Sequence, residues 1–358
     1  MKKAAWLMFV LGAMVMETRG QNQGEFERMR ETFGQLTTLA GKGEKDKVGN
    51  SWRSAFEGKA ATDAELSNPH ITMGDDAGNY YIADKRSHRI LKIDPEGLIT
   101  THAGTGESGF NGEQGQAREV QLSFPNGLYV LPNGTVYIMD TFNFRIRKVD
   151  PEGKLTTVIK DEEGFHHGRG LWVSPDEKLI YYCGSDRSQP NSRLRKWTPE
   201  GGSETVIGGF YDLAYFTVDP KGNILVTEQG AGRVFRISPD GKTKEHLAGN
   251  GSEDEPVSGR QATEIGLHEV RGIALRKDGS YFLCTHKGGD IVFVDTKGIA
   301  HVFIEGRGRG NVHDGDGQSV KVPGEKISEP RAVTLAPNGD LLITCNDNGF
   351  VRVVKKKK

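Results

Sequence analysis

A pattern of about 40 residues recurs six times along this chain of 358 residues, and it restricts the fold more than any other feature. The clearest copy is Pro125–Asp150, in which polar and apolar residues alternate between turns such as Asn133-Gly134. This alternation, with its β-branched and aromatic residues, predicts short antiparallel strands joined by tight turns. A single meander of this kind cannot bury both of its faces, so each copy needs copies beside it. The six copies begin at Pro69, Pro125, Gly168, Leu213, Val270 and Pro330.

The two ends of the chain indicate how the copies are arranged. Copies one to five are each followed by a fourth strand, whereas the sixth copy is not. A matching strand without a preceding meander stands at Gln35–Gly41. The sequence therefore predicts an all-β fold, a six-bladed β-propeller with four-stranded antiparallel blades, in which the N-terminal strand completes the last blade. Such closure leaves no open sheet edge at the seam.

The first 20 residues differ in kind from the rest. Lys2 and Lys3 precede the apolar run Ala4–Met16, which has the pattern of a signal peptide and is too short for a transmembrane helix. The expected location is therefore secreted or periplasmic, with no membrane span in the mature chain. The expected divisions are a signal peptide (1–20), a linker (21–33), the propeller (34–354) and a basic tail (355–358).

Charge argues against one class of partner. The formal net charge of −1 becomes −3 when the signal peptide is removed, because it carries three basic residues and one acidic residue. A slightly acidic chain is poorly suited to bind nucleic acid.

At this point a family resemblance can be stated. Residues 125–149 and 69–93 resemble the NHL repeat, and the run GFNGEQGQA at Gly109–Ala117 is similar to the linking motif of that family. The resemblance covers residues 34–354 and implies a six-bladed propeller. Some NHL propellers bind RNA, an alternative that the expected export and the acidic charge oppose. Propellers host many functions, so the resemblance specifies the fold more than the activity.

An acidic residue ends the second strand in three copies, and an arginine follows five places later. We expect these pairs to be structural ion pairs that hold the turn between strands two and three. The pairs are Asp84/Arg89, Asp140/Arg145 and Glu228/Arg233.

The second residue of each copy is expected to point to the mouth of the central channel. Arginine occupies this position in three of six copies, which predicts a cationic funnel suited to carboxylate or phosphate. Asp75 and Asp219 are candidates to neutralise part of this charge. The channel-mouth residues are His70, Asn126, Arg169, Ala214, Arg271 and Arg331. The long loops that lead into the strands of this rim are also expected to carry binding function.

A second resemblance gives an alternative function. Residues 170–185 and 218–237 are similar to the gluconolactonase/senescence-marker-protein family of metal-dependent lactonases. This resemblance implies a hydrolase with a divalent metal (Ca, Zn or Mg), and it matches Asp219 to a metal ligand and Asn126 to a substrate contact. Arg169 stands where that family has a metal-binding Asn, and a guanidinium repels cations.

Other metal sites have weaker patterns. His70 occupies a position similar to a zinc-binding histidine of the amidating-lyase propellers, but zinc needs three converging ligands. His166 and His167 are adjacent and would face opposite ways in a strand. Asp314 and Asp316 lack the further ligands of a calcium loop. The sequence thus predicts an exported binding or protein-interaction module whose partner is a small anionic ligand or an extracytoplasmic protein.

Overall fold

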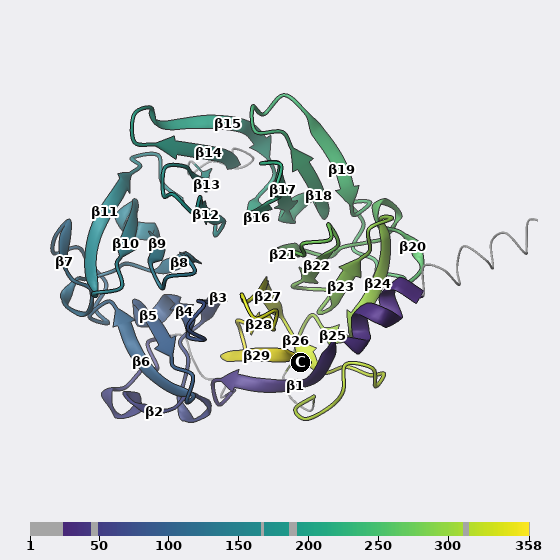
Figure 1. The fold of residues 1–358 in the computed structure, drawn as a ribbon, viewed down its shortest axis with the longest axis horizontal. Coiled ribbons are helices and arrows are strands. Elements are labelled where there is room, and N and C mark those ends of the chain that lie inside the picture. The colour runs from purple at the N-terminus through teal and green to yellow at the C-terminus, as the bar shows by residue number, and fades with distance from the viewer. Residues whose placement is uncertain (1–23, 44–48, 166–167, 186–191, 311–314, 358) are drawn as a thin grey trace, which may run out of the picture.

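The computed structural model describes residues 24–43, 49–165, 168–185, 192–310 and 315–357. Six antiparallel sheets are arranged in a ring (Figure 1). The first strands of the blades contact one another in a closed inner circle, in the order β3, β8, β12, β16, β21 and β27. The predicted six-bladed propeller is therefore confirmed.

Each blade runs outward from its first strand to its fourth. Blade 1 comprises β3 (Pro69–Gly74), β4 (Tyr80–Asp84), β5 (Arg89–Ile93) and β6 (Leu98–Ala103); blade 2 comprises β8 (Pro125–Val130), β9 (Val136–Asp140), β10 (Arg145–Val149) and β11 (Lys154–Lys160). Blade 3 comprises β12 (Leu171–Val173), β13 (Ile180–Ser185), β14 (Ser192–Thr198) and β15 (Gly202–Phe210); blade 4 comprises β16 (Leu213–Val218), β17 (Ile224–Glu228), β18 (Arg233–Ile237) and β19 (Lys244–Ala248). Blade 5 comprises β21 (Val270–Leu275), β22 (Tyr281–Thr285), β23 (Ile291–Val294) and β24 (Ile299–Ile304); blade 6 comprises β27 (Pro330–Leu335), β28 (Leu341–Cys345), β29 (Phe350–Lys356) and β1 (Phe33–Ala40).

Short elements lie in the connections. Two-to-three-residue edge strands extend three blades: β2 (Lys59–Ala60), β7 (Gln114–Gln116) and β20 (Arg260–Gln261). A parallel pair, β25 (Gly306–Arg307) and β26 (Ile327–Ser328), lies before blade 6. The 3-10 turns are η1 (Ser54–Phe56), η2 (Ala61–Asp63), η3 (Lys85–Ser87), η4 (Ala117–Glu119), η5 (Thr141–Asn143), η6 (Gln229–Ala231) and η7 (Ala262–Glu264).

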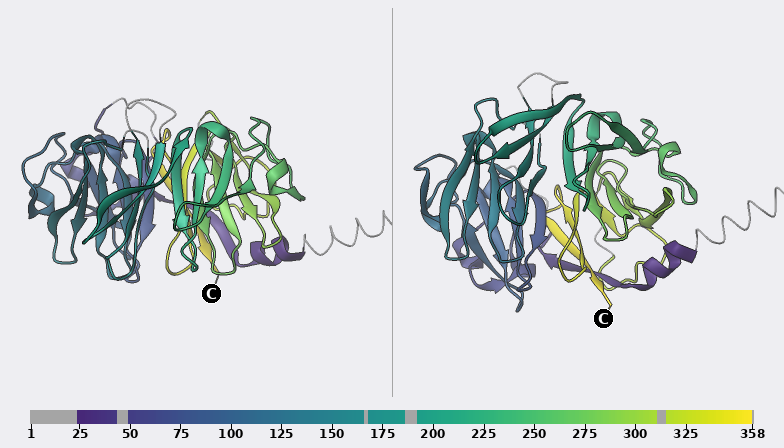
Figure 2. Two further views of the ribbon diagram at one scale, coloured as in Figure 1. Left: turned by 90° about the horizontal axis from the view of Figure 1, so that it is seen from above. Right: turned by 45° about the horizontal axis from the view of Figure 1, so that its top comes forward.

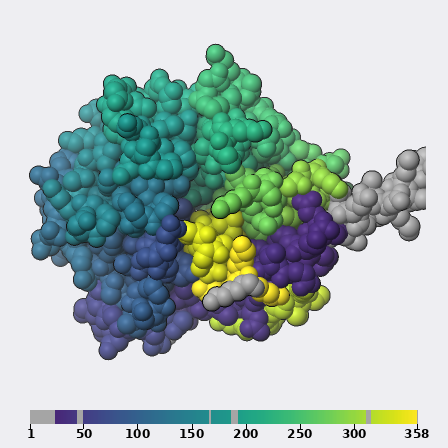
Figure 3. All heavy atoms as spheres, in the orientation of Figure 1, coloured from purple at the N-terminus to yellow at the C-terminus, as the bar shows by residue number. Residues whose placement is uncertain are grey.

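The N-terminal strand closes the ring as predicted. β1 pairs antiparallel with β29, and Leu36 lies opposite Val354. Figure 3 shows the N-terminal residues in purple against the C-terminal residues in yellow. Leu36 and Ala40 are fully buried, so the strand contributes core side chains as well as backbone hydrogen bonds.

The segments on either side of the predicted propeller also pack against it. Residues 24–31 form a helix that continues the closure (Figure 1), with Phe26 and Met29 buried. The Phe26 ring stacks on His301 with centroids 4.5 Å apart, which attaches the helix to blade 5. At the other end β29 extends to Lys356, and Lys355 Nζ donates to Asp340 Oδ2 at 2.9 Å.

The acids and arginines that recur in three copies of the repeat have separate partners, so the predicted ion pairs are wrong. Among the described residues, no hydrogen bond or ion pair joins any of these acids to the arginine five places later. The acids accept backbone N–H groups that lead into their own blade: Ser67 N to Asp84 (2.6 Å), Ser123 N to Asp140 (2.7 Å) and Tyr211 N to Glu228 (2.7 Å). The arginines donate to loop carbonyls: Arg89 to Thr105 (2.7 Å), Arg145 to Asn143 (2.6 Å) and Arg233 to Asn250 (3.3 Å). Both roles remain structural, because these side chains satisfy backbone groups of the connecting loops.

Candidate ligand-binding site at the channel mouth

All six first strands begin on the same face of the ring, here called the mouth face. The chain leaves β29 at the opposite face, where Figure 2 (left) shows the C-terminus. His70, Asn126, Arg169 and Arg271 are buried, with 1–9% of their surface exposed, and Arg331 is half-buried. His70, Asn126, Arg271 and Arg331 are each the second residue of a first strand, as the repeat register predicts, whereas Arg169 stands two residues before β12.

The three arginines are close enough to repel one another. Burial and then the charge of Arg271 lower the pKa of Arg169 to about 10. Burial, Arg169 and Arg271 also lower the pKa of Arg331. The structure thus brings the three predicted guanidinium groups into one electrostatic cluster.

Arg331 has a neutral partner. Its Nη1 lies 3.1 Å from His70 Nε2, and His70 Nδ1 lies 2.9 Å from the carbonyl oxygen of Asn68. Because the guanidinium only donates, Nε2 must accept, so we assign the proton of His70 to Nδ1, which donates to Asn68. Burial and the charge of Arg331 hold the pKa of His70 well below its usual value. The charge of Arg331 is therefore not compensated by this contact.

Arg169 also has a neutral partner, whereas Arg271 has an acidic one. Arg169 Nη2 donates to Gln229 Oε1 at 3.2 Å, and Arg271 Nη2 donates to Glu269 Oε2 at 2.5 Å. The Nε atoms of Arg271 and Arg331 are buried without a hydrogen-bond partner among the described residues. Donors that lack acceptors at this depth are costly, and an incoming anion would satisfy them.

Lys85 adds a fourth cation that the sequence analysis missed. It begins η3, directly after β4, and its ammonium makes no hydrogen bond or ion pair with any described residue. Burial lowers the pKa of Lys85 to about 8, with further contributions from Arg331, Arg169, Arg86 and Arg271. We call Lys85, Arg169, Arg271 and Arg331 the axial cations.

The residue after each second strand is the signal that could have revealed Lys85. In the other blades with a described residue there, this position holds Thr141, Gln229, His286 and Asn346. Gln229 contacts Arg169, and Asn346 Nδ2 donates to the carbonyl oxygen of Pro69, the residue before His70, at 3.1 Å. Burial and the arginines of the axial cations lower the pKa of His286 far below its usual value. This position therefore forms a second ring of polar side chains around the first.

Asn126 belongs to the same face but has few partners. Its Nδ2 lies 3.4 Å from the carbonyl oxygen of Gly168, and its Oδ1 is buried without a hydrogen-bond partner. It is thus an acceptor available beside the axial cations.

Asp219 does not lie at the mouth, which corrects the sequence-based expectation. It stands in the turn between β16 and β17 and accepts from Asn223 N, Asn223 Nδ2 and Lys221 N at 2.8–2.9 Å. Asp219 is five positions after Ala214 along the strand direction, which corresponds to about 16 Å. Asp75 occupies the same turn of blade 1 and is held by Asn79 and Tyr81. Neither carboxylate can neutralise the axial cations.

The described residues do not assemble the lactonase metal site. Asn126 and Asp219 stand at opposite ends of the inner strands. The corresponding mouth-face position of blade 3 holds Arg169, whose positive charge repels a metal ion. No group of three or more His, Cys, Asp or Glu side chains in the described ranges is placed to hold a metal. His166, His167 and Asp314 lie outside those ranges, while Asp316 accepts from Thr38 (2.6 Å) and Arg352 (2.7 Å).

The residue before each first strand has an unusual backbone conformation. Five non-glycine residues there have positive φ angles of 49–69°, in the left-handed region. They are Asn68, Phe124, Asp212, Glu269 and Glu329. Each such residue costs about 1–3 kcal/mol of strain, and strain of this kind gathers at ligand sites. Three of the five are acidic, so the mouth face has an acidic rim around the axial cations.

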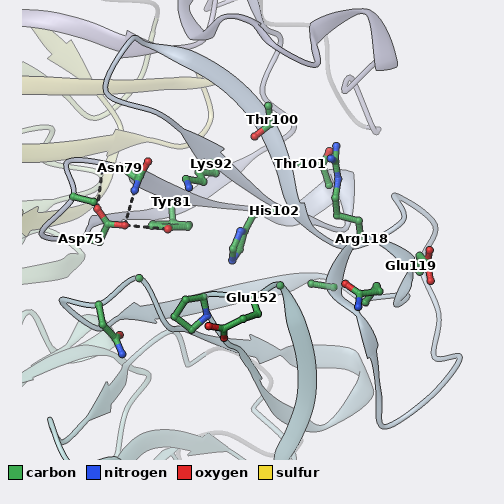
Figure 4. Close-up of a pocket in the computed structure, with 17 residues that line it drawn as sticks. Asp75, Asn79, Tyr81, Lys92, Thr100, Thr101, His102, Arg118, Glu119 and Glu152 are labelled. Carbon is green, nitrogen blue, oxygen red and sulfur yellow. Dashed lines mark hydrogen bonds between the residues drawn. The ribbon is translucent and has the colours of Figure 1, made fainter.

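Two cavities bear on the choice of site. One of about 330 Å³ lies on the mouth face between blades 4 and 5 and includes Gln229 and Glu269. Another, of about 570 Å³, lies between blades 1 and 2 on the opposite side (Figure 4). In the second cavity Asp75 is already bonded to Asn79 and Tyr81, and burial lowers the pKa of His102 to about 4, which keeps it neutral. The first cavity adjoins the axial cations, whereas the second does not.

Comparisons with known proteins agree with this architecture. No protein-family model matches the chain. The chain is 25% identical over 201 residues to a gluconolactonase of Zymomonas mobilis subsp. mobilis, covering 48% of this chain and 52% of the relative. It is 23% identical over 303 residues to NHL repeat-containing protein 2 of Bos taurus, covering 80% of this chain and 38% of the relative. The chain thus spans about half or less of these curated relatives.

Solved structures show the same fold at low identity. A protein of unknown function from Bacteroides thetaiotaomicron superposes with a TM-score of 0.69 at 14% identity, over 90% of this chain and 76% of that one. An auxiliary nutrient binding protein from Bacteroides ovatus superposes with a TM-score of 0.64 at 13% identity, over 91% of this chain and 77% of that one. Identity at this level supports the fold alone. The chain is therefore a six-bladed β-propeller of NHL-like repeats, with NHL-repeat proteins and a gluconolactonase among its relatives.

Proposed function

We propose that the protein is an exported binding propeller that captures a small carboxylate or phosphate at the channel mouth. The observation that carries the proposal is the group of axial cations, of which Arg169, Arg331 and Lys85 have no acidic partner in contact. A buried charge without a counter-ion is strongly disfavoured, so an anion that reaches these groups gains their full interaction. An auxiliary nutrient binding protein has the same fold, so this fold is compatible with a binding role. An extracytoplasmic protein that presents a carboxylate is the alternative partner.

The proposal predicts how affinity depends on pH. Lys85 loses its proton near its pKa of about 8, so the affinity for succinate should fall as the pH rises from 7 to 9. Succinate itself is fully ionised over this range, which assigns the change to the protein. Isothermal titration calorimetry at constant ionic strength measures the affinities, and a series of carboxylates and sugar phosphates should be screened first.

Two variants make this test specific. Lys85→Gln should weaken binding about tenfold at pH 7 and remove the decline above it, because one charge-assisted hydrogen bond is lost. Arg118→Gln is the matched control: Arg118 is an exposed cation paired with Glu57 on the outer side of blades 1 and 2. An affinity that is unchanged in Lys85→Gln, or the absence of binding by every anion tested, would contradict the proposal.

Export is the second part of the proposal. Residues 1–20 have the signal-peptide pattern and lie outside the described residues, whereas the helix over 24–31 carries buried Phe26 and Met29. Among the described residues, every helix is too short or too polar to cross a lipid bilayer. We expect cleavage close to residue 20, which leaves the helix intact. Cell fractionation and N-terminal sequencing check this; an intracellular product that retains the first 20 residues would refute export.

The lactonase alternative draws on the gluconolactonase relative. Its chemistry needs oxygen or nitrogen ligands that converge on a divalent cation. The separation of Asn126 from Asp219, and the guanidinium of Arg169 beside Asn126, do not fit such a centre. No catalytic step is therefore assigned to this chain.

A further inference from the structure

The cavity between blades 4 and 5 has charge of the opposite sign from the axial cations. Its volume is about 330 Å³, at the small end for ligand sites. Its polar lining includes Tyr211, Asp212, Gln229, Glu253, Glu269 and Lys287. Two of these residues, Gln229 and Glu269, are the contacts of Arg169 and Arg271. The cavity and the axial cations therefore share a wall.

Asp212 is the carboxylate in this cavity that lacks a partner. Its Oδ1 is buried and has no hydrogen bond among the described residues. Its backbone is held in the left-handed region at φ 61°, while its carbonyl oxygen accepts from Gln229 N at 2.9 Å. The fold thus fixes an acidic side chain at a strained position where its oxygen is desolvated and unsatisfied.

The other charged groups of the cavity have partners. Glu269 is bound by Arg271 and by Lys287. Glu253 lies at the rim with its side chain 81% exposed, 3.6 Å from His268 Nε2. Asp212 is also within electrostatic range of Arg169, since its charge opposes the lowering of the pKa of that arginine by burial. One carboxylate and one guanidinium, neither with an oppositely charged partner in direct contact, therefore lie near each other at this end of the cavity.

We propose that the mouth site takes a small zwitterion, a molecule with a primary ammonium group and a carboxylate. The ammonium donates to Asp212 Oδ1 in the cavity, and the carboxylate accepts from Arg169 among the axial cations. This inference rests on the proposed function, which concerns the carboxylate, and adds the ammonium and its receptor. A ligand with only a negative charge meets repulsion from Asp212, and a ligand with only a positive charge meets repulsion from Arg169. A ligand with both charges satisfies each side without leaving either buried group unpaired.

Matched ligands separate the two charges. The probes are glycine, β-alanine and 4-aminobutyrate, together with the N-acetyl derivative and the carboxamide of each. Acetylation removes the ammonium charge, and amidation removes the carboxylate charge. By isothermal titration calorimetry at pH 7, the best zwitterion should bind at least tenfold more tightly than its N-acetyl derivative, and its carboxamide should not bind measurably.

Asp212→Asn is the decisive variant. Asparagine tolerates positive φ, so the backbone is preserved while the charge is lost. The variant should lose about tenfold in affinity for the zwitterion and keep or gain affinity for the N-acetyl derivative. Asp63→Asn, at an exposed position in η2, is the control and should change neither affinity.

The outcomes distinguish this inference from the proposed function. If N-acetyl derivatives bind as tightly as the zwitterions, or if Asp212→Asn leaves their ratio unchanged, the zwitterion is overturned and anion binding stands. If no carboxylate of either kind binds, and none in the wider screen, the proposed function fails and the zwitterion fails with it.

Discussion

Replacing Arg169 with methionine should raise the stability of the protein and at the same time weaken anion binding. Arg169 is 6% exposed, its contact with Gln229 is neutral, and Arg271 repels it. Exchanging a buried charge for an apolar side chain of similar volume is often stabilising, here by about 1–3 kcal/mol. The lost charge-assisted hydrogen bonds should weaken anion binding by about 10- to 100-fold. Urea unfolding and calorimetric titration of the same preparation measure both effects.

Arg147→Met is the matched control for this prediction. The Arg147 side chain is fully buried, but its Nη1 forms an ion pair with Asp140 at 3.2 Å. Its loss leaves a buried carboxylate without its counter-ion and should destabilise the protein by about 3–5 kcal/mol. Should Arg169→Met destabilise the protein as Arg147→Met does, Arg169 would be a structural residue and the binding site would have to lie elsewhere.

Shortening Leu36 to alanine should cost about 2–5 kcal/mol of folding free energy. Leu36 lies in β1, the strand that closes blade 6, and its side chain is completely buried in the core. Deletion of residues 1–41 should have the larger effect, because it removes the whole strand and opens the edge of β29. Chemical unfolding followed by circular dichroism reports the first effect, and gel filtration reports the aggregation expected from the second.

Leu98→Ala provides the comparison. Leu98 lies in β6 of blade 1 and is 39% exposed, so its truncation should cost less than about 1 kcal/mol. A folded, monomeric product without residues 1–41, or an equal cost for the two leucine variants, would show that β1 is dispensable.

The repeat register explains why so much of the fold could be predicted. The turn glycines and alternating strands are local signals, and the unmatched strand at Gln35–Gly41 specified the closure that β1 makes with β29. The helix over 24–31 was missed because its stability depends on Phe26 meeting blade 5, which no local pattern records. The acid and arginine pairs were misassigned because backbone groups of the loops compete for the same side chains.

The sequence predicted the candidate site only for residues whose place in the ring follows from the register of the repeat. Arg169, Arg271 and Arg331 meet because equivalent residues of all blades face the same axis. Asp219 was misplaced because a match to a family position says nothing about which end of a strand the residue occupies. Lys85 was missed because it stands in a 3-10 turn whose direction depends on tertiary structure. The burial of Lys85 and its proximity to the three arginines arise only when the blades are assembled into the ring.

The closure of blade 6 also sets the order in which the protein can mature. β1 comes before blades 1 to 5 in the sequence and β29 comes after them, yet they lie side by side in one sheet (Figure 1). Blades 1 to 5 are each contiguous in sequence and can form as they emerge, whereas blade 6 must wait until β29 has been synthesised. Until then β1 has an unpaired edge and exposed apolar side chains. During that interval the unpaired edge of β1 is a place where another chain can pair.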